Sequence, residues 1–173
     1  MLAYGSRRGA HGMKTLYVLR HGQATPEGEA GSDRERALTP RGRAEVQRTA
    51  QYLSGRAQQP SLILTSSATR ARQTAELCAA GSGGAPVLVA LDGLYLAEPP
   101  SYLAALATRA EPHGAALVVG HNPGLEALIY VLTDRSEHLA TASLVEIALP
   151  IAAWTELSGS GHGFGRFVDA FRG

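Results

Sequence analysis

The chain has 173 residues, a net charge of +1, a pI near 8.0, 45% hydrophobic residues and 18% charged residues. This length suits one domain with a single hydrophobic core, and the nearly balanced charge argues against a nucleic-acid-binding protein. Cys78 is the only cysteine, which excludes an intrachain disulfide and cysteine-rich zinc sites. No apolar run approaches the roughly 20 residues of a membrane-spanning helix, so we expect a cytoplasmic protein without membrane or nucleic-acid partners.

Residues 1–12 differ in composition from the rest of the chain. They are rich in Gly, Ser and Arg, and they lack the apolar segment of a secretory signal peptide. We interpret them as a disordered leader, either the remnant of a tag or a stretch upstream of a start at Met13. The fold is therefore expected in residues 13–173, as one domain.

Strand and helix signals alternate after the leader. Residues 15–19 form a short β-rich apolar run, and residues 23–36 are a loop rich in Gly, Pro and acidic residues. A helix then starts at Pro40, behind the N-cap candidate Thr39, and stops near Gly55.

The remaining segments complete an α/β pattern. Further strands are predicted over residues 62–64, 87–91 and 115–119, and further helices over residues 68–80, 101–109 and 123–132. The tail then shows three late strands, over residues 143–149, 152–157 and 166–171. Strands that alternate with helices favour a mainly parallel sheet covered by helices, to which the tail adds antiparallel edge strands. We therefore predict a three-layer α/β/α sandwich.

Polar residues that suit a phosphate group follow three of the predicted strands. The three sets are Arg20-His21-Gly22, Thr65-Ser66 with Arg70 just inside the next helix, and Gly120-His121-Asn122. Ligands of open α/β sheets bind beyond the carboxyl ends of the strands, where helix N-termini also favour anions. The sequence therefore predicts a phosphate site at this edge of the sheet.

The composition of this site suggests phosphoryl transfer through a histidine. A neutral imidazole nitrogen of His21 can attack phosphorus and form a phosphohistidine that water hydrolyses. Arg20, Arg70 and His121 would donate hydrogen bonds to the phosphoryl oxygens, and Asn122 could add a neutral donor. Gly22, without a side chain, would let the backbone approach the phosphate. This chemistry needs no metal or other cofactor, and the sequence contains no set of residues with metal-ligand spacing.

Four sequence blocks resemble the histidine phosphatase superfamily, which includes phosphoglycerate mutases and acid phosphatases. They are LRHG at residues 19–22, LTPRGR at 38–43, residues 66–75 and VGHNP at 119–123. The resemblance implies a phosphoglycerate mutase-like fold, a phosphorylated nucleophile at His21, and a phosphate pocket completed by Arg20, Arg70 and His121.

Short connections after the second helix resemble the short bacterial branch typified by the SixA phosphohistidine phosphatase. Superfamily members that cleave phosphate esters also use a carboxylic acid, which here would be Asp92 or Glu98, without a clear motif match. Because imidazole leaves phosphorus without such help more easily than an alkoxide does, phosphohistidine in a protein is the favoured substrate. Two alternatives stay open: a phosphatase of small phosphorylated metabolites, and a phosphate-binding module without turnover. The Leu94-Tyr95-Leu96 run lines the substrate entrance or packs in the core.

Overall fold

The computed structural model describes residues 12–29, 31–159 and 161–173. Its strands are β1 (Lys14–Arg20), β2 (Leu62–Ser66), β3 (Val87–Leu91), β4 (Ala115–Gly120), β5 (Leu144–Leu149) and β6 (Arg166–Phe171). Its α-helices are α1 (Pro40–Ser54), α2 (Thr69–Gly81), α3 (Pro99–Arg109) and α4 (Gly124–Thr133), and short 3-10 helices are η1 (Asp33–Glu35), η2 (Asp92–Leu94) and η3 (Trp154–Gly159). Apart from Gly12, the predicted leader lies outside the described residues.

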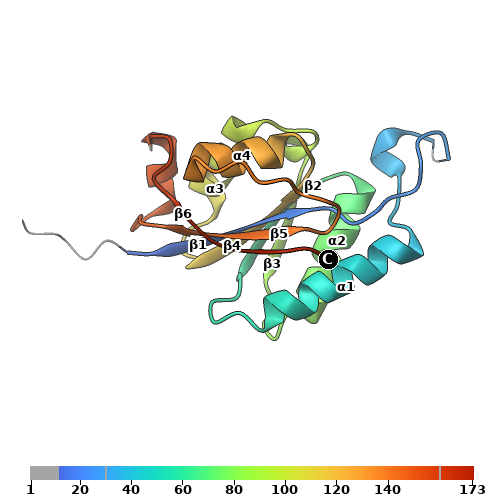
Figure 1. Cartoon of the computed structure of the whole chain (residues 1–173), viewed down its shortest axis with the longest axis horizontal. Coiled ribbons are helices and arrows are strands. Elements are labelled where there is room, and N and C mark those ends of the chain that lie inside the picture. The colour runs from blue at the N-terminus through green and yellow to red at the C-terminus, as the bar shows by residue number, and fades with distance from the viewer. Residues whose placement is uncertain (1–11, 30, 160) are drawn as a thin grey trace, which may run out of the picture.

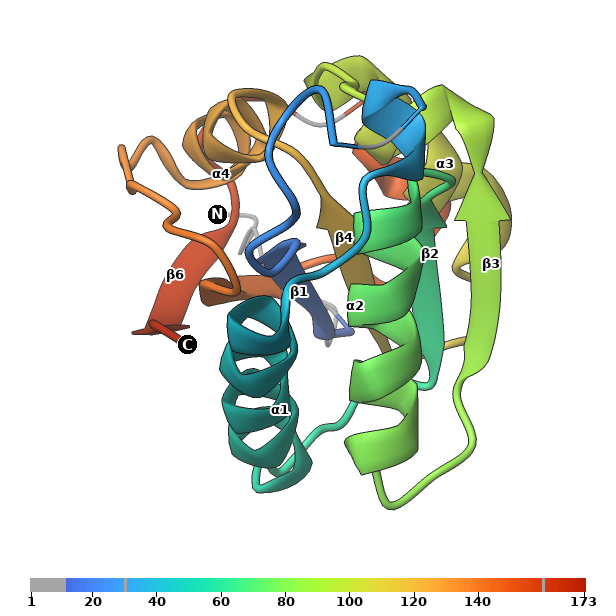
Figure 2. The same cartoon turned by 90° about the vertical axis from the view of Figure 1, so that its right-hand side faces the viewer.

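The strands form one mixed sheet in the order β3-β2-β4-β1-β5-β6. Strands β3, β2, β4 and β1 are parallel, whereas β5 runs antiparallel to β1 and β6 runs antiparallel to β5. Helices α1 and α2 lie side by side on one face of the sheet, and α3 and α4 cover the other face (Figures 1 and 2). The predicted three-layer architecture, with its antiparallel C-terminal edge, is therefore confirmed.

Strand β1 shows how the sequence builds both layers of the core. Leu16 and Val18 pack in the cluster that contains α3 and α4, while Tyr17 and Leu19 pack in the cluster that contains α1 and α2. Successive side chains of a strand point to opposite faces, so an unbroken apolar run is what a central strand covered on both faces requires. All four of these side chains are fully buried.

Helix α1 begins as the sequence predicts. Thr39 has an extended backbone, and its hydroxyl accepts the Gly42 N–H at 3.0 Å. Pro40 occupies the first turn, where a missing N–H costs no helical hydrogen bond. Among the described residues, none of the helices is both long and apolar enough to cross a membrane.

The predicted strand over residues 152–157 is wrong, because this segment forms the 3-10 helix η3. The Glu156 carboxylate accepts the N–H groups of Ala152 and Ala153, both at 2.8 Å, and thereby closes a turn. The Trp154 indole is fully buried and donates to the His113 carbonyl at 2.6 Å. This anchoring places Trp154 in the core cluster on the face of the sheet that α3 covers.

Candidate active site

A cavity of about 510 Å³ opens where β1, β2 and β4 end. Its walls are formed by Arg20, His21, Gln23, Ala24, Glu27, Asp33, Arg36, Arg70, Tyr95, Leu96, His121, Asn122 and Thr141. The parallel strands thus bring together most of the predicted site, although Gly22, Asp92 and Glu98 are not among the lining residues. The backbone order explains this convergence, because the carboxyl ends of parallel neighbours meet at one edge of the sheet.

The hydrogen bonds of His21 fix the proton on its imidazole ring. Nδ1 lies 2.8 Å from the Gly22 carbonyl oxygen, which can only accept, so Nδ1 carries the proton. Nε2 therefore presents a lone pair, which accepts the Nε–H of Arg70 at 3.2 Å. Burial, reinforced by the charges of Arg70 and Arg20, lowers the pKa of His21 to about 4. The ring is thus a neutral potential nucleophile at physiological pH.

Gly22 packs against the helices next to His21 and does not line the cavity. A Cβ at this position would lie 2.7 Å from both the Gly42 carbonyl oxygen and Val46 Cγ2, so only glycine fits against α1. The Gly22 N–H donates to the Thr74 hydroxyl at 3.2 Å. The predicted approach of this backbone to a phosphate is therefore corrected: its N–H is used by α2, and its Cα packs against α1.

Arg20 reaches the cavity from the last position of β1. One terminal nitrogen donates to the Leu139 carbonyl at 2.8 Å, while the buried Nε has no hydrogen-bond partner among the described residues. Burial lowers the pKa of Arg20, although an arginine remains charged at neutral pH. A cation held in this way is suited to binding an anion.

Arg70 is almost completely buried, at 2% exposure, and it touches both histidines of the cavity. Its Nε donates to His21, one terminal nitrogen donates to the Asp33 carbonyl at 2.6 Å, and the other donates to the Asp33 carboxylate at 2.9 Å. The latter nitrogen also lies 3.5 Å from His121 Nδ1. The guanidinium therefore links the two rings.

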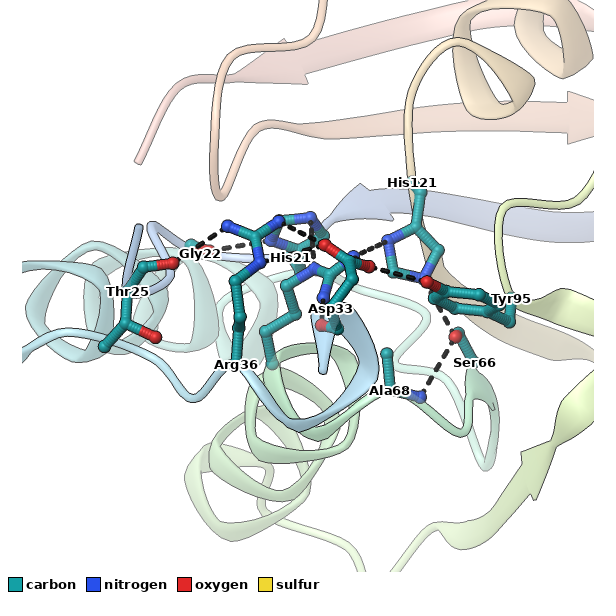
Figure 3. A network of polar contacts seen from close by, with 10 residues as sticks. His21, Gly22, Thr25, Asp33, Arg36, Ser66, Ala68, Tyr95 and His121 are labelled. Atoms are coloured by element: carbon teal, nitrogen blue, oxygen red, sulfur yellow. Dashed lines mark hydrogen bonds and ion pairs between the residues drawn. The ribbon is translucent and has the colours of Figure 1, made fainter. Parts of the chain in front are cut away.

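Asp33 organises one wall of the cavity, although its sequence position indicates only a polar loop. Besides Arg70, its carboxylate accepts the Nε–H of Arg36 at 2.9 Å and the hydroxyl of Tyr95 at 2.6 Å (Figure 3). The Tyr95 hydroxyl, and after it the two guanidinium groups, hold the pKa of this carboxyl far below its usual range. Asp33 is therefore ionised at every pH at which the protein would work.

His121 follows β4 and stands beside His21, with the two ring centroids 5.1 Å apart. Its Nε2 lies 2.8 Å from the Ser66 hydroxyl. The Tyr95 and His121 rings form an edge-to-face contact with their centroids 5.6 Å apart. Burial, followed by the neighbouring His21 and Arg70, lowers the pKa of His121 to about 3. This second ring is therefore also neutral at physiological pH.

Asn122 lines the cavity, but its amide N–H groups, which the sequence predicts as donors to a phosphate, bind other protein groups. Nδ2 donates to the Glu126 carboxylate at 2.7 Å and to the Leu139 carbonyl at 2.9 Å. The predicted neutral donor is therefore corrected to a residue that ties the start of α4 to the loop before β5.

The two carboxylic acids considered in the sequence lie outside the cavity. Asp92 is bound to Arg34 at 2.9 Å and to the Ser67 hydroxyl at 2.5 Å, with 81% of its side chain exposed. Glu98 occupies the N-cap position of α3 without a side-chain capping bond. Of the Leu94-Tyr95-Leu96 run, Tyr95 and Leu96 line the cavity and Leu94 packs in the core, so both interpretations hold for part of it.

Comparisons with known proteins show what this chain is similar to in sequence. The model of a family described as the histidine phosphatase superfamily (branch 1) matches residues 16–94. An uncharacterized protein of Picosynechococcus is 33% identical over 139 residues, which are 75% of this chain and 82% of that protein. An uncharacterized chloroplastic protein of Arabidopsis thaliana is 28% identical over 162 residues, 86% of this chain and 73% of that protein.

Solved structures of similar shape include two proteins that are each described as a putative phosphohistidine phosphatase SixA. The protein from Nakamurella multipartitia superposes with a TM-score of 0.80 at 25% identity, over 95% of this chain and 98% of its own. The protein from Agrobacterium tumefaciens gives a TM-score of 0.77 at 25% identity, over 92% and 98% of the two chains. The similarity therefore extends over nearly the whole chain.

Proposed function

This chain belongs to the histidine phosphatase superfamily, in its SixA-type branch, and is a phosphatase; on that premise we propose that it acts through a phosphohistidine intermediate on His21. We further propose that its substrates are proteins phosphorylated on histidine. The hydrogen bonds of the His21 ring carry the mechanism, since the Gly22 carbonyl holds the proton on Nδ1 and leaves the lone pair on Nε2, where the Nε–H of Arg70 contacts it in this structure.

The reaction consists of two transfers at phosphorus. Nε2 of His21 attacks, the new P–N bond forms, and the bond to the substrate imidazole breaks with its electron pair on the departing nitrogen. A substrate ring that is protonated on its other nitrogen then leaves as neutral imidazole. Water next attacks the phosphorylated His21, releases inorganic phosphate and returns the ring to its neutral form.

We propose that three donors stabilise the negative charge of the transferred group. Arg20 has an unpartnered buried Nε, Arg70 lies against the nucleophile, and His121 stands 5.1 Å from it between ring centroids. Guanidinium groups form charge-assisted hydrogen bonds with phosphoryl oxygens, and a neutral imidazole can add one N–H. Because these groups supply the charge, no step of this scheme requires a metal.

The carboxylates favour imidazole over an alkoxide as the leaving group. Asp33 lines the cavity, but its hydrogen bonds keep it ionised, so it has no proton to donate. Asp92 and Glu98 lie outside the cavity wall, and Glu27, which lines it, is exposed. An alkoxide needs a general acid, whose contribution is about 10²–10⁴-fold, whereas imidazole has a pKa of about 6.5 and leaves without one.

Two measurements test this proposal. The chain should hydrolyse a phosphohistidine peptide far faster than an alkyl phosphate, and Glu27→Gln, Asp92→Asn and Glu98→Gln should leave the former rate unchanged. Rapid quenching should trap an acid-labile phosphoryl group on His21, and His21→Ala should abolish both labelling and turnover. Efficient alkyl phosphate hydrolysis that one of the three carboxyl variants abolishes would instead establish a phosphatase of small metabolites.

A further inference from the structure

We propose that Ser66 is a positioning residue that holds the His121 ring in the tautomer with its proton on Nδ1, so that this N–H is directed to the phosphoryl group. The inference rests on the proposed function, which places a phosphoryl group in the cavity. Ser66 is the last residue of β2, is fully buried, and does not itself line the cavity. It acts only through the histidine that its hydroxyl contacts.

The hydrogen bonds of the Ser66 hydroxyl indicate which group accepts its single proton. Its oxygen accepts the backbone N–H of Ala68 at 3.2 Å and lies 2.8 Å from Nε2 of His121 (Figure 3). In the part of the chain that the structure describes, no other acceptor is bonded to this hydroxyl. The proton of Ser66 is therefore donated to Nε2, and a neutral His121 ring then carries its own proton on Nδ1.

The opposite tautomer would be less stable. With the proton on Nε2, the ring would donate to Ser66, and the proton of the buried hydroxyl would lose its acceptor, which is unfavourable in the protein interior. In exchange, Nδ1 could accept from a terminal nitrogen of Arg70 that is 3.5 Å away, at the outer limit of a hydrogen bond. The contact between Ser66 and His121 is a hydrogen bond in both tautomers, so the deciding difference is that the buried Ser66 proton has an acceptor only when Nε2 is unprotonated.

The favoured tautomer leaves a site for an anion between two donors. Nδ1 of His121 and a terminal nitrogen of Arg70 lie 3.5 Å apart in two residues that line the cavity, and in the favoured tautomer neither can accept from the other. One phosphoryl oxygen can accept from both. A donor that is already oriented stabilises the transition state without reorganising during the reaction, and Ser66 provides that orientation.

The tautomer can be read directly, without reference to activity. Long-range ¹H–¹⁵N spectra of the full chain at pH 7 distinguish protonated from unprotonated ring nitrogens, and His121→Gln identifies the signals of this ring. We expect Nδ1 of His121 to be protonated in the wild-type protein, and Ser66→Ala to shift the ring toward protonated Nε2. A wild-type His121 with its proton on Nε2 would overturn the proposal, whatever the enzyme hydrolyses.

Kinetics then tests whether Ser66 acts through His121. Ser66→Ala should lower kcat/KM by about 10- to 10²-fold, less than the ~10²–10³-fold that losing a complete oxyanion donor costs, and Ser66→Thr should restore most of it. Ser143→Ala is the matched control, because this hydroxyl is equally buried but has no partner among the described residues; its activity should be unchanged.

A double-mutant cycle separates positioning from a general structural role. Adding Ser66→Ala to His121→Gln should cause no further loss of kcat/KM, whereas an additive loss would refute the inference. The failure of the proposed function would look different. In that case the wild-type protein would show the Nδ1–H tautomer but would form no phosphohistidine on His21.

Discussion

Replacing Asp33 with asparagine tests whether one carboxylate holds the wall of the cavity together. The substitution keeps the shape of the side chain but removes its charge. It also replaces one accepting oxygen with an NH₂ group, which faces the donors of Arg70, Arg36 and Tyr95. Hydrogen bonds to charged groups contribute about 1.5–3 kcal/mol each, but the Asp33 side chain is 33% exposed and solvent weakens such pairs. We therefore expect Asp33→Asn to lower the free energy of unfolding by about 2 kcal/mol, or the Tm by about 4–8 °C.

The same variant should alter how stability depends on pH. Because the pKa of Asp33 is held far below its usual range in the folded protein, its stabilisation is complete above the unfolded pKa of about 3.9 and is lost as the pH falls below that value. At pH 3 the folded carboxyl is still ionised, while the unfolded one is mostly protonated. By linkage, the stability gap between wild type and Asp33→Asn should shrink by about 1 kcal/mol between pH 7 and pH 3.

Urea unfolding at the two pH values measures both quantities, and Asp92→Asn is the matched control. Asp92 also binds an arginine and a hydroxyl, but its side chain is 81% exposed, so its replacement should change stability much less. Asp33→Asn should also reduce kcat/KM, because Arg70 loses the group that orients it. A stability gap that is absent at pH 7, or that is the same size at pH 3, would refute the reasoning.

Three further predictions concern His21 and the start of α1. The His21 ring should stay neutral from pH 7 down to near its pKa of about 4, and a midpoint near 6.5 in an NMR titration of its ring protons would contradict this. Gly42→Ala should destabilise the fold by about 1–3 kcal/mol or more, because the new Cβ would lie 2.0 Å from the Gln23 carbonyl oxygen. Gly55→Ala should be nearly neutral in thermal unfolding, because its Cβ would lie 3.5 Å from the nearest atom, the Tyr52 carbonyl oxygen. Thr39→Ala should cost about 1 kcal/mol in urea unfolding by removing the helix cap, and an unchanged midpoint would show that the cap contributes nothing.

Short-range sequence patterns predict the helices and strands whose ends form the cavity. Thr39 and Pro40 mark the start of α1 because capping involves only neighbouring residues. The buried strands are recognisable because a strand covered on both faces must be apolar along its whole length. The convergence of His21, Arg70 and His121 then follows from a single rule, since the carboxyl ends of parallel strands share one edge of the sheet.

Long-range partners explain what the sequence did not predict. Asp33 lies in a loop of ordinary polar composition, and its role depends on Arg70 and Tyr95, which are 37 and 62 residues away. Asn122 looked like a donor to phosphate because nothing in the sequence pairs it with Leu139. The segment 152–157 has a pattern that suits a strand, but the contact between Trp154 and the distant His113 carbonyl, together with the turn that Glu156 closes, decides against it.

In the free protein, the arginine proposed to bind phosphate also restrains the nucleophile. The Nε–H of Arg70 occupies the lone pair of His21 Nε2, the atom that must attack phosphorus, while its terminal nitrogens are held by Asp33. On the proposed mechanism, attack requires the N–H groups of Arg70 to turn from His21 toward the phosphoryl oxygens. An anionic phosphoryl group can compete for them because it adds an attraction between opposite charges that the neutral His21 ring does not offer the guanidinium. Water offers a weaker neutral oxygen, so the nucleophile is released chiefly when a phosphoryl group is bound.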